Sequence, residues 1–192
     1  MTRQDFDEEI EWCIQILKSG GTILYPTDTI WGIGCDATNA RAVEKVYSIK
    51  QRAESKSLIV LVDTFDKIAD YVTKVPDVAY DLVKNIDTPV TIIYSGARNL
   101  ARNVIASDGT IAIRVVNDEF CQQLIGRFGK PIVSSSANVS GEETPLIFNH
   151  IARQIINEVD YTVSINHEKV NRTKPSTIIR LHENGEFLII RP

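Results

Sequence analysis

Short β-branched runs alternate with amphipathic segments along most of this chain, and this alternation restricts the possible folds more than any other feature. Runs rich in Val, Ile and Thr predict strands at 22–25, 58–62, 90–94, 110–116, 131–134, 161–165, 176–181 and 187–191. Apolar residues three and four positions apart predict helices at 5–18, 40–47, 65–72, 76–86, 118–127 and 147–157. Strands separated by helices pair mostly in parallel, whereas Asn184-Gly185 predicts a hairpin between the last two strands. The sequence therefore predicts a mixed α/β fold with a partly parallel sheet.

Residues at the element boundaries support this reading. Gly20-Gly21 is a natural stop for the first helix, and Asn39 is a suitable N-cap for the second. Residues 27–38 are polar and contain Gly32 and Gly34, so we expect them to form a loop. No repeat and no linker divides the 192 residues, and we expect a single domain over 1–192.

Composition excludes several classes of protein. The longest aliphatic run, at 58–62, is far shorter than the ~20 apolar residues of a membrane helix, and the acidic N-terminus resembles no signal peptide. We therefore expect a cytoplasmic protein without a membrane span. Cys13, Cys35 and Cys121 are expected to be buried thiols, and with the three His they form no metal-binding pattern, so no protein-held metal is predicted. The net charge of -4 leaves nucleic-acid binding to a local basic cluster at most.

Polar loops at strand ends are the usual ligand sites of open α/β sheets, and three such loops stand out. The first loop, at 26–34, offers threonine hydroxyls and a glycine-rich backbone that could surround a small polar ligand. The alternative is an ordinary turn capped by Asp28, with Trp31 in the core.

The second loop carries a cationic cluster. Lys50, Arg52 and Lys56 lie within seven residues at the end of a predicted helix. A helix C-terminus favours cations whatever the function, so a surface cluster is one interpretation and a polyphosphate clamp is the other. The sequence has neither a P-loop nor a GxGxxG motif, so a nucleotide site would be of another kind.

The third loop, at 134–141, reads SSSANVSG after a predicted strand. Small side chains would let backbone N–H groups approach an anion, although a flexible surface loop has the same composition. The loop lacks a GxSxG setting, and no His lies nearby in sequence to act as a base. Covalent catalysis by serine is therefore disfavoured.

Taken together, these motifs resemble the YrdC-like family of threonylcarbamoyl-AMP synthases. The family signature is KxR followed far downstream by SxN, and here it reads Lys50-x-Arg52 and Ser136-x-Asn138. The resemblance covers 20–191 and includes, in matching order, a PT-acid-T segment, a PVT strand, an (I/V)-A-(I/V)-R strand, SANxSG and a late ST strand. The fold that this resemblance implies is a twisted mixed parallel and antiparallel sheet, flanked by helices and curved around a large concave site.

The resemblance also implies an activity, that of a nucleotidyltransferase making threonylcarbamoyl-AMP and pyrophosphate from L-threonine, bicarbonate and ATP for threonylcarbamoyladenosine in tRNA. It implies catalysis by Lys50 and Arg52, within an ATP site of Lys50, Arg52, Lys56, Thr110, Ser136, Asn138, Thr144 and Arg191. It implies a threonine site of Thr29, Arg114, Ser134 and Ser176, with Arg114 pairing the carboxylate. The implied cofactor is Mg2+ carried with ATP, and the implied partners are a tRNA and a threonylcarbamoyl-transferase complex.

Several positions depart from the family pattern. Trp31 replaces the usual Tyr, Leu61 stands where His is frequent, and other departures are Ala53, Ser57 and the Asp-Thr-Pro at 87–89. They keep open a paralogue of the same fold with a different nucleotide-linked or hydrolytic activity. The basic residues between 45 and 56 keep open a module that binds tRNA or double-stranded RNA. Because the sequence ends at Pro192, we expect the short, one-domain form of the family.

Overall fold

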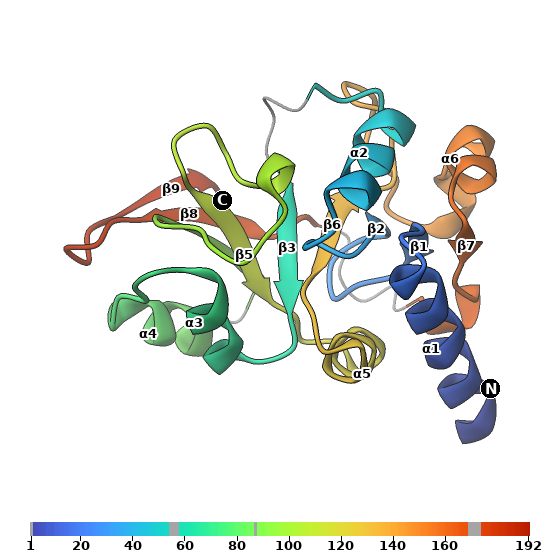
Figure 1. Cartoon of the computed structure of the whole chain (residues 1–192), viewed down its shortest axis with the longest axis horizontal. Coiled ribbons are helices and arrows are strands. Elements are labelled where there is room, and N and C mark those ends of the chain that lie inside the picture. The colour runs from blue at the N-terminus through green and yellow to red at the C-terminus, as the bar shows by residue number, and fades with distance from the viewer. Residues whose placement is uncertain (1, 54–57, 87, 169–173) are drawn as a thin grey trace.

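A computed structural model describes residues 2–53, 58–86, 88–168 and 174–192, so Lys56, Ser57 and Asp87 lie outside the described residues. Its centre is a nine-stranded sheet of order β7-β1-β2-β6-β3-β5-β4-β8-β9 (Figure 1). The strands are β1 (Ile23–Tyr25), β2 (Gly32–Gly34), β3 (Ile59–Val62), β4 (Val90–Tyr94), β5 (Ile111–Val115), β6 (Ile132–Ser136), β7 (Tyr161–Thr162), β8 (Thr177–Leu181) and β9 (Phe187–Arg191).

The sheet is mixed, as the sequence predicts. Strand β3 pairs in parallel with β5, β4 with β8, and β1 with β7. The other neighbours, including β3 with β6 and β4 with β5, are antiparallel. The predicted hairpin joins β8 to β9, and Gly185 in its turn has a φ of 90°, a value that glycine adopts without strain.

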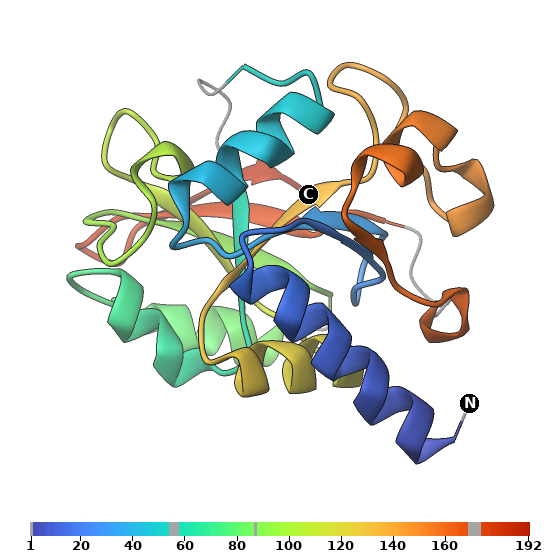
Figure 2. The same ribbon diagram turned by 45° about the vertical axis from the view of Figure 1, so that its right-hand side comes forward.

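Helices cover both faces of this sheet. They are α1 (Arg3–Lys18), α2 (Ala40–Ile49), α3 (Ile68–Tyr71), α4 (Val78–Asn85), α5 (Glu119–Phe128) and α6 (Arg153–Glu158), with short 3-10 turns at 65–67, 102–104, 148–150 and 165–167. Apolar residues of α2, α3 and α4 form one core cluster with the sheet. Helices α1 and α5 lie side by side and form a second cluster against the sheet (Figure 2).

Alternation along the strands separates these two sides. On β5, Ile111 and Ile113 are buried in the first cluster, whereas Ala112 and Arg114 point to the opposite face. On β3, Val60 belongs to the first cluster, and Leu61 packs into the second. The face that carries α1 and α5 is therefore also the face from which Arg114 projects.

The predicted helix boundaries are confirmed at two places. The Asn39 side chain accepts hydrogen bonds from the backbone N–H groups of Arg41 and Ala42, as an N-cap does. Helix α1 ends at Lys18, and Gly20 follows with a φ of 77°. The three cysteines are buried and free, also as expected.

The expectation that 27–38 is a loop throughout was wrong, because β2 lies within it. Gly32 and Gly34 present no side chains, so the segment lacks the apolar alternation that identifies a strand. The space explains the glycines, since a Cβ on Gly34 would lie 2.5 Å from Tyr25 Cε1 and 2.8 Å from the carbonyl oxygen of Val133. Only a residue without a side chain fits between these neighbours.

Two elements near the C-terminus are shorter than expected. The helix predicted at 147–157 is divided into a 3-10 turn, Phe148–His150, and α6, because Ile151 and Ala152 adopt extended backbone angles. The strand predicted at 161–165 ends at Thr162, where its pairing with β1 stops. Helical periodicity alone does not detect such a break between two short turns.

Candidate active site

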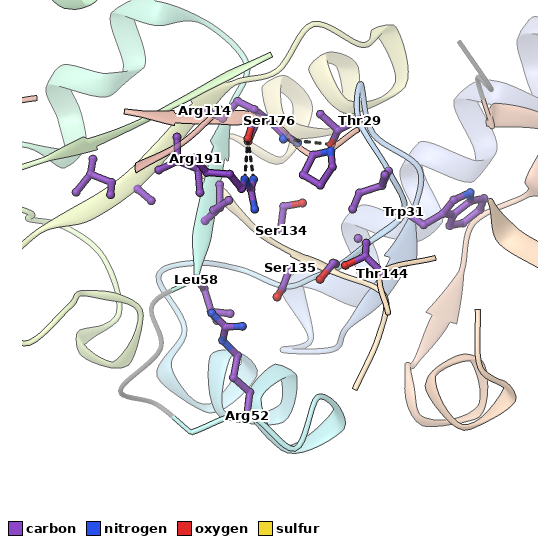
Figure 3. Close-up of a pocket in the computed structure, with 18 residues that line it drawn as sticks. Thr29, Trp31, Arg52, Leu58, Arg114, Ser134, Ser135, Thr144, Ser176 and Arg191 are labelled. Atoms are coloured by element: carbon purple, nitrogen blue, oxygen red, sulfur yellow. Dashed lines mark hydrogen bonds between the residues drawn. The ribbon is translucent and has the colours of Figure 1, made fainter. Parts of the chain in front are cut away.

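A cavity of about 270 Å³ opens on the uncovered part of the sheet face that carries α1 and α5 (Figure 3). Its floor consists of strand residues that point away from the first core cluster, such as Ile59, Ile93, Ala112 and Ile178. The cavity gathers these residues of the expected site: Thr29, Arg52, Arg114, Ser134, Ser136, Thr144, Ser176 and Arg191. All three polar loops therefore contribute to one cavity.

Arg114 is fixed at the inner wall of the cavity. Its Nη1 donates a hydrogen bond to Thr29 Oγ1 at 3.2 Å, and its Nη2 lies 3.2 Å from Asp28 Oδ1. The Arg114 and Asp28 side chains are each only 4% exposed, and Asp28 Oδ2 accepts a hydrogen bond from the backbone N–H of Asn117. The Arg114 Nε is buried without a hydrogen-bond partner among the described residues. This guanidinium thus has unused donor capacity in a buried setting.

Arg191 reaches the same cavity from β9. Its Nε and Nη2 donate to the main-chain carbonyl oxygen of Ser176 at 3.1 and 2.7 Å (Figure 3). The Ser176 hydroxyl in turn lies 2.7 Å from Thr91 Oγ1. Burial lowers the pKa of Arg191, and the charge of Arg114 lowers this pKa further. Two guanidinium groups close enough to repel each other create a site that favours an anionic ligand.

Arg52 supplies a third guanidinium from the loop that follows α2. Figure 3 shows its side chain directed toward Leu58, at the side of the cavity opposite Arg114. Burial lowers the pKa of Arg52, but the pKa of a guanidinium is so high that the group stays charged at neutral pH. Hydroxyl groups of Ser134, Ser136 and Thr144 line the cavity between these arginines.

Lys50 does not line this cavity, in contrast to Arg52. Its side chain is 1% exposed, and its Nζ donates hydrogen bonds to the main-chain carbonyl oxygens of Ser136 and, at 2.7 Å, of Asn138. The backbone N–H of Ser140 donates to the Lys50 carbonyl oxygen at 2.8 Å. Burial lowers the pKa of Lys50 to about 8, and the charge of Arg52 adds to this effect. In this structure Lys50 holds the third loop.

Two other residues of the expected ATP site lie outside this cavity. Asn138 is buried, and its Nδ2 donates to the carbonyl oxygens of Val139 and Glu142, which shapes the third loop. Thr110 lines a neighbouring cavity of about 280 Å³, which also contains Asp108 and Arg180. The two cavities share the side chains of Ile93 and Ala112 as lining residues, so the spaces adjoin each other.

Sequence reasoning missed the apolar floor of the site and assigned no binding role to Leu58 or Pro175, and it included Ser135 only as part of the third loop. The floor had a detectable signal, because residues that alternate with core positions on a strand must face the other side.

Leu61, a departure from the family pattern, is buried in the second core cluster and does not line the cavity. Trp31 is 1% exposed and also forms part of the cavity wall, so its expected burial in the core does not exclude a functional role of the first loop.

Two further observations concern the part of the chain that the structure describes. Within the described ranges, no group of three or more His, Cys, Asp and Glu is placed to hold a metal ion. In the same parts of the chain, no helix has the length and apolar character needed to cross a bilayer. The lining of the cavity offers hydroxyls and guanidiniums, which suit phosphate and carboxylate groups.

Comparisons with known sequences give consistent matches. A family model described as Sua5_yciO_yrdC, telomere recombination, matches residues 15–192. A threonylcarbamoyl-AMP synthase of Pseudoalteromonas translucida is 36% identical over 168 residues, which cover 86% of this chain and 89% of that protein. A threonylcarbamoyl-AMP synthase of Psychromonas ingrahamii is 33% identical over 141 residues, which cover 72% of this chain and 74% of that protein.

Solved structures share the fold. P. abyssi Sua5 complexed with L-threonine matches with a TM-score of 0.83 and 24% identity over 95% of this chain, which corresponds to 53% of that chain. This chain therefore spans about half the length of that Sua5 protein. E. coli YciO matches with a TM-score of 0.81 and 27% identity, over 95% of this chain and 87% of that chain.

Proposed function

The chain belongs to the Sua5/YciO/YrdC family, and from this we propose that it is a threonylcarbamoyl-AMP synthase. As a nucleotidyltransferase, it would convert L-threonine, bicarbonate and ATP into threonylcarbamoyl-AMP and pyrophosphate. The observation that carries the proposal is the convergence of Arg52, Arg114 and Arg191 on one hydroxyl-lined cavity. Such a site suits a reaction between two anionic substrates, and relatives with this activity in their names match most of the chain.

We assign the phosphate end of the cavity to Arg52. Its guanidinium can donate two parallel hydrogen bonds to phosphate oxygens, while Ser136 and Thr144 provide nearby hydroxyls. Arg191 lies between this end and Arg114, where it can neutralise charge on the nucleotide. Thr110 extends the proposed ATP site into the adjoining cavity, and Lys56 stays a predicted ligand outside the described residues.

We assign the amino-acid end to Thr29, Arg114, Ser134 and Ser176. The Arg114 guanidinium lines this end of the cavity and is suited to a carboxylate oxygen, because hydrogen bonds between charged groups are the stronger ones. A P. abyssi relative has been solved with L-threonine, which is consistent with an amino-acid site in this fold. Asp28 partly neutralises Arg114, so the site would not hold an uncompensated charge before substrate binds.

The reaction needs placement and charge neutralisation more than a proton-transfer residue. The threonine amine and bicarbonate form a carbamate with release of water. A carbamate oxygen then attacks the α-phosphorus of ATP, a new P–O bond forms, and the bond to the leaving pyrophosphate breaks. Holding the two anions together lowers the entropic part of the barrier, and guanidinium groups stabilise the charge that develops. By resemblance, Lys50 and Arg52 are the proposed catalytic residues, with Lys50 acting through the loop it holds.

Mg2+ is the proposed cofactor. The cavity lining contains no Asp or Glu among the described residues, so the ion would be bound by ATP phosphates and water. The hydroxyls of Ser136 and Thr144 are available as additional oxygen ligands. The ion would neutralise phosphate charge when bound.

The downstream partners also stay predictions. The product would pass to a threonylcarbamoyl-transferase complex that modifies tRNA. A synthase that supplies this complex would act in the cytoplasm. Lys50 is buried and so adds no exposed charge to the basic cluster that the sequence places between 45 and 56. This argues against the RNA-binding module as the main function.

A paralogue with another nucleotide-linked or hydrolytic activity is the second candidate. Trp31 at the wall of the proposed threonine end is the relevant departure from the family pattern. The two candidates differ in their requirement for threonine.

An omission experiment separates these candidates. Wild-type protein is incubated with ATP, Mg2+, L-threonine and bicarbonate, and pyrophosphate is measured with each component left out in turn. We expect release that depends on all of them and is strongly reduced in Lys50→Ala and Arg52→Ala. Release that persists without threonine would favour the paralogue, and no release above the variants would contradict the synthase.

A further inference from the structure

Trp31 connects the first loop to other parts of the molecule. Its main-chain carbonyl oxygen accepts a hydrogen bond from the backbone N–H of Ala137 at 3.1 Å. In Figure 3 its indole ring projects away from Ser134 and Arg191, although the residue forms part of the cavity wall. The ring therefore lies behind the first loop and not inside the cavity.

The indole is held by Glu168. Trp31 Nε1 donates a hydrogen bond to Glu168 Oε1 at 2.5 Å, and the backbone N–H of Phe148 donates to the same oxygen at 2.6 Å. The rings of Trp31 and Phe148 pack with centroids 4.9 Å apart. Hydrogen bonds to a carboxylate are stronger than those between neutral groups, and this one is partly screened from water. Glu168 thus holds the Trp31 indole and the main chain of Phe148, whose ring packs against that indole.

We propose that Glu168 is a positioning residue for the amino-acid end of the cavity. Thr29 lies two residues before Trp31, and its hydroxyl accepts a hydrogen bond from Arg114 at 3.2 Å. A displacement of Trp31 would move Thr29 relative to Arg114, and these two residues are assigned to threonine. Glu168 does not line the cavity and would act only through Trp31. This inference rests on the proposed function and adds a residue to it.

Steady-state kinetics test the effect on substrate binding. Glu168→Ala removes the acceptor, and we expect the KM for threonine to rise about tenfold, with the KM for ATP changed by less than about twofold. Glu168→Gln keeps a carbonyl oxygen that can accept both hydrogen bonds, so it should restore most of the threonine affinity. Glu158→Ala, at an exposed position of α6, is the matched control.

Tryptophan fluorescence tests the anchoring without catalysis. The chain has two tryptophans, and Trp12 is 57% exposed on α1, so Trp12→Phe leaves Trp31 as the single reporter. In this background we expect Glu168→Ala to increase quenching of Trp31 by acrylamide, and Glu168→Gln to increase it much less. Absence of pyrophosphate release by the wild-type protein would contradict the proposed synthase activity. The quenching measurement would still show whether Glu168 holds Trp31.

Trp31→Phe keeps the proposal testable if Glu168→Ala does not fold. This variant retains an aromatic ring but loses the N–H donor, and it should raise the threonine KM in the same direction. The proposal would be overturned by an unchanged threonine KM in the folded variants, or by equal increases in the KM values for threonine and ATP. Quenching of Trp31 that does not respond to Glu168→Ala would also overturn it.

Discussion

Lys50 donates a hydrogen bond from its buried Nζ to the main-chain carbonyl oxygen of Asn138 at 2.7 Å, although 88 positions separate the two residues. A second bond to the Ser136 carbonyl oxygen and a return bond from the Ser140 N–H complete the link. The two signature segments of the family are thus joined by the Lys50 ammonium and by one main-chain hydrogen bond. The carbonyl groups use two of the three N–H donors of the ammonium, and a contact with phosphate would require the buried third donor to become accessible.

Lys50→Met tests this link. Methionine has a similar length but no donor, so the carbonyl oxygens of Ser136 and Asn138 would lose a charged partner. We expect the free energy of unfolding in urea to fall by about 2 kcal/mol and the KM for ATP to rise. Lys18→Met makes the same change at an exposed position of α1 and should alter stability by less than about 0.5 kcal/mol. Equal effects of the two substitutions would contradict the link.

The pH dependence of stability provides an independent test of the buried amine. Burial lowers the pKa of Lys50 from its ordinary value of 10.5 to about 8. Between these values the unfolded chain retains a proton that the folded chain has released, so this group makes the free energy of unfolding rise with pH. Lys50→Met should lose that contribution. The stability difference between wild type and variant is therefore expected to grow from pH 8 to 10.5, and a constant or shrinking difference would refute the assignment.

Arg52 should respond differently from Lys50, because it lines the cavity directly. Arg52→Ala is expected to lower kcat/KM for ATP by about 10- to 100-fold, the loss of a charged hydrogen-bonding pair. Arg52→Lys keeps the charge but not the planar two-donor geometry, so its loss should be smaller. Arg41→Ala changes an exposed arginine of α2 and serves as control. The phosphate assignment fails if Arg52→Ala behaves like Arg41→Ala.

The local chemistry of the chain predicted much of its fold. Asn39 caps the start of α2, and Asn184-Gly185 forms the turn between β8 and β9. Both features depend only on residues that are adjacent in the sequence, so local sequence predicts them. Strand β2 was missed because the space at Gly34 is limited by Tyr25 and Val133 and the space at Gly32 by Ser134, and residues 133 and 134 are about a hundred positions away in the sequence. Contacts with residues that are distant in the sequence leave no pattern in the sequence around the glycines.

The same distinction applies to the site. The three loops were predicted from their polar residues. The resemblance to the YrdC-like family supplied the roles of the individual residues, most of which line one cavity. The direction of the Lys50 side chain was not predictable, because a lysine at a helix end can reach solvent, a phosphate or a carbonyl group with similar backbone geometry. Glu168 carries no motif, and its importance depends on the packing of Trp31 against Phe148.

The buried pair of Asp28 and Arg114 yields a further stability prediction. Asp28→Asn keeps the shape of the side chain but leaves the guanidinium without its counter-charge in a site where both side chains are 4% exposed. We expect the free energy of unfolding to fall by about 3 kcal/mol. Asp66→Asn, at an exposed position, should have little effect in the same thermal or urea assay. A loss no larger than that of Asp66→Asn would show that the pair is not significant.

The central claim is that this cavity joins threonine, bicarbonate and ATP into one product. The most direct measurement is mass spectrometry of the nucleotide products after incubation with 13C-bicarbonate and 15N-threonine. The synthase predicts one adenylate that carries both labels and forms in equal amount to pyrophosphate, with strongly reduced yield in Arg52→Ala. An adenylate that lacks either label, or ATP cleavage without a labelled adenylate, would contradict the claim.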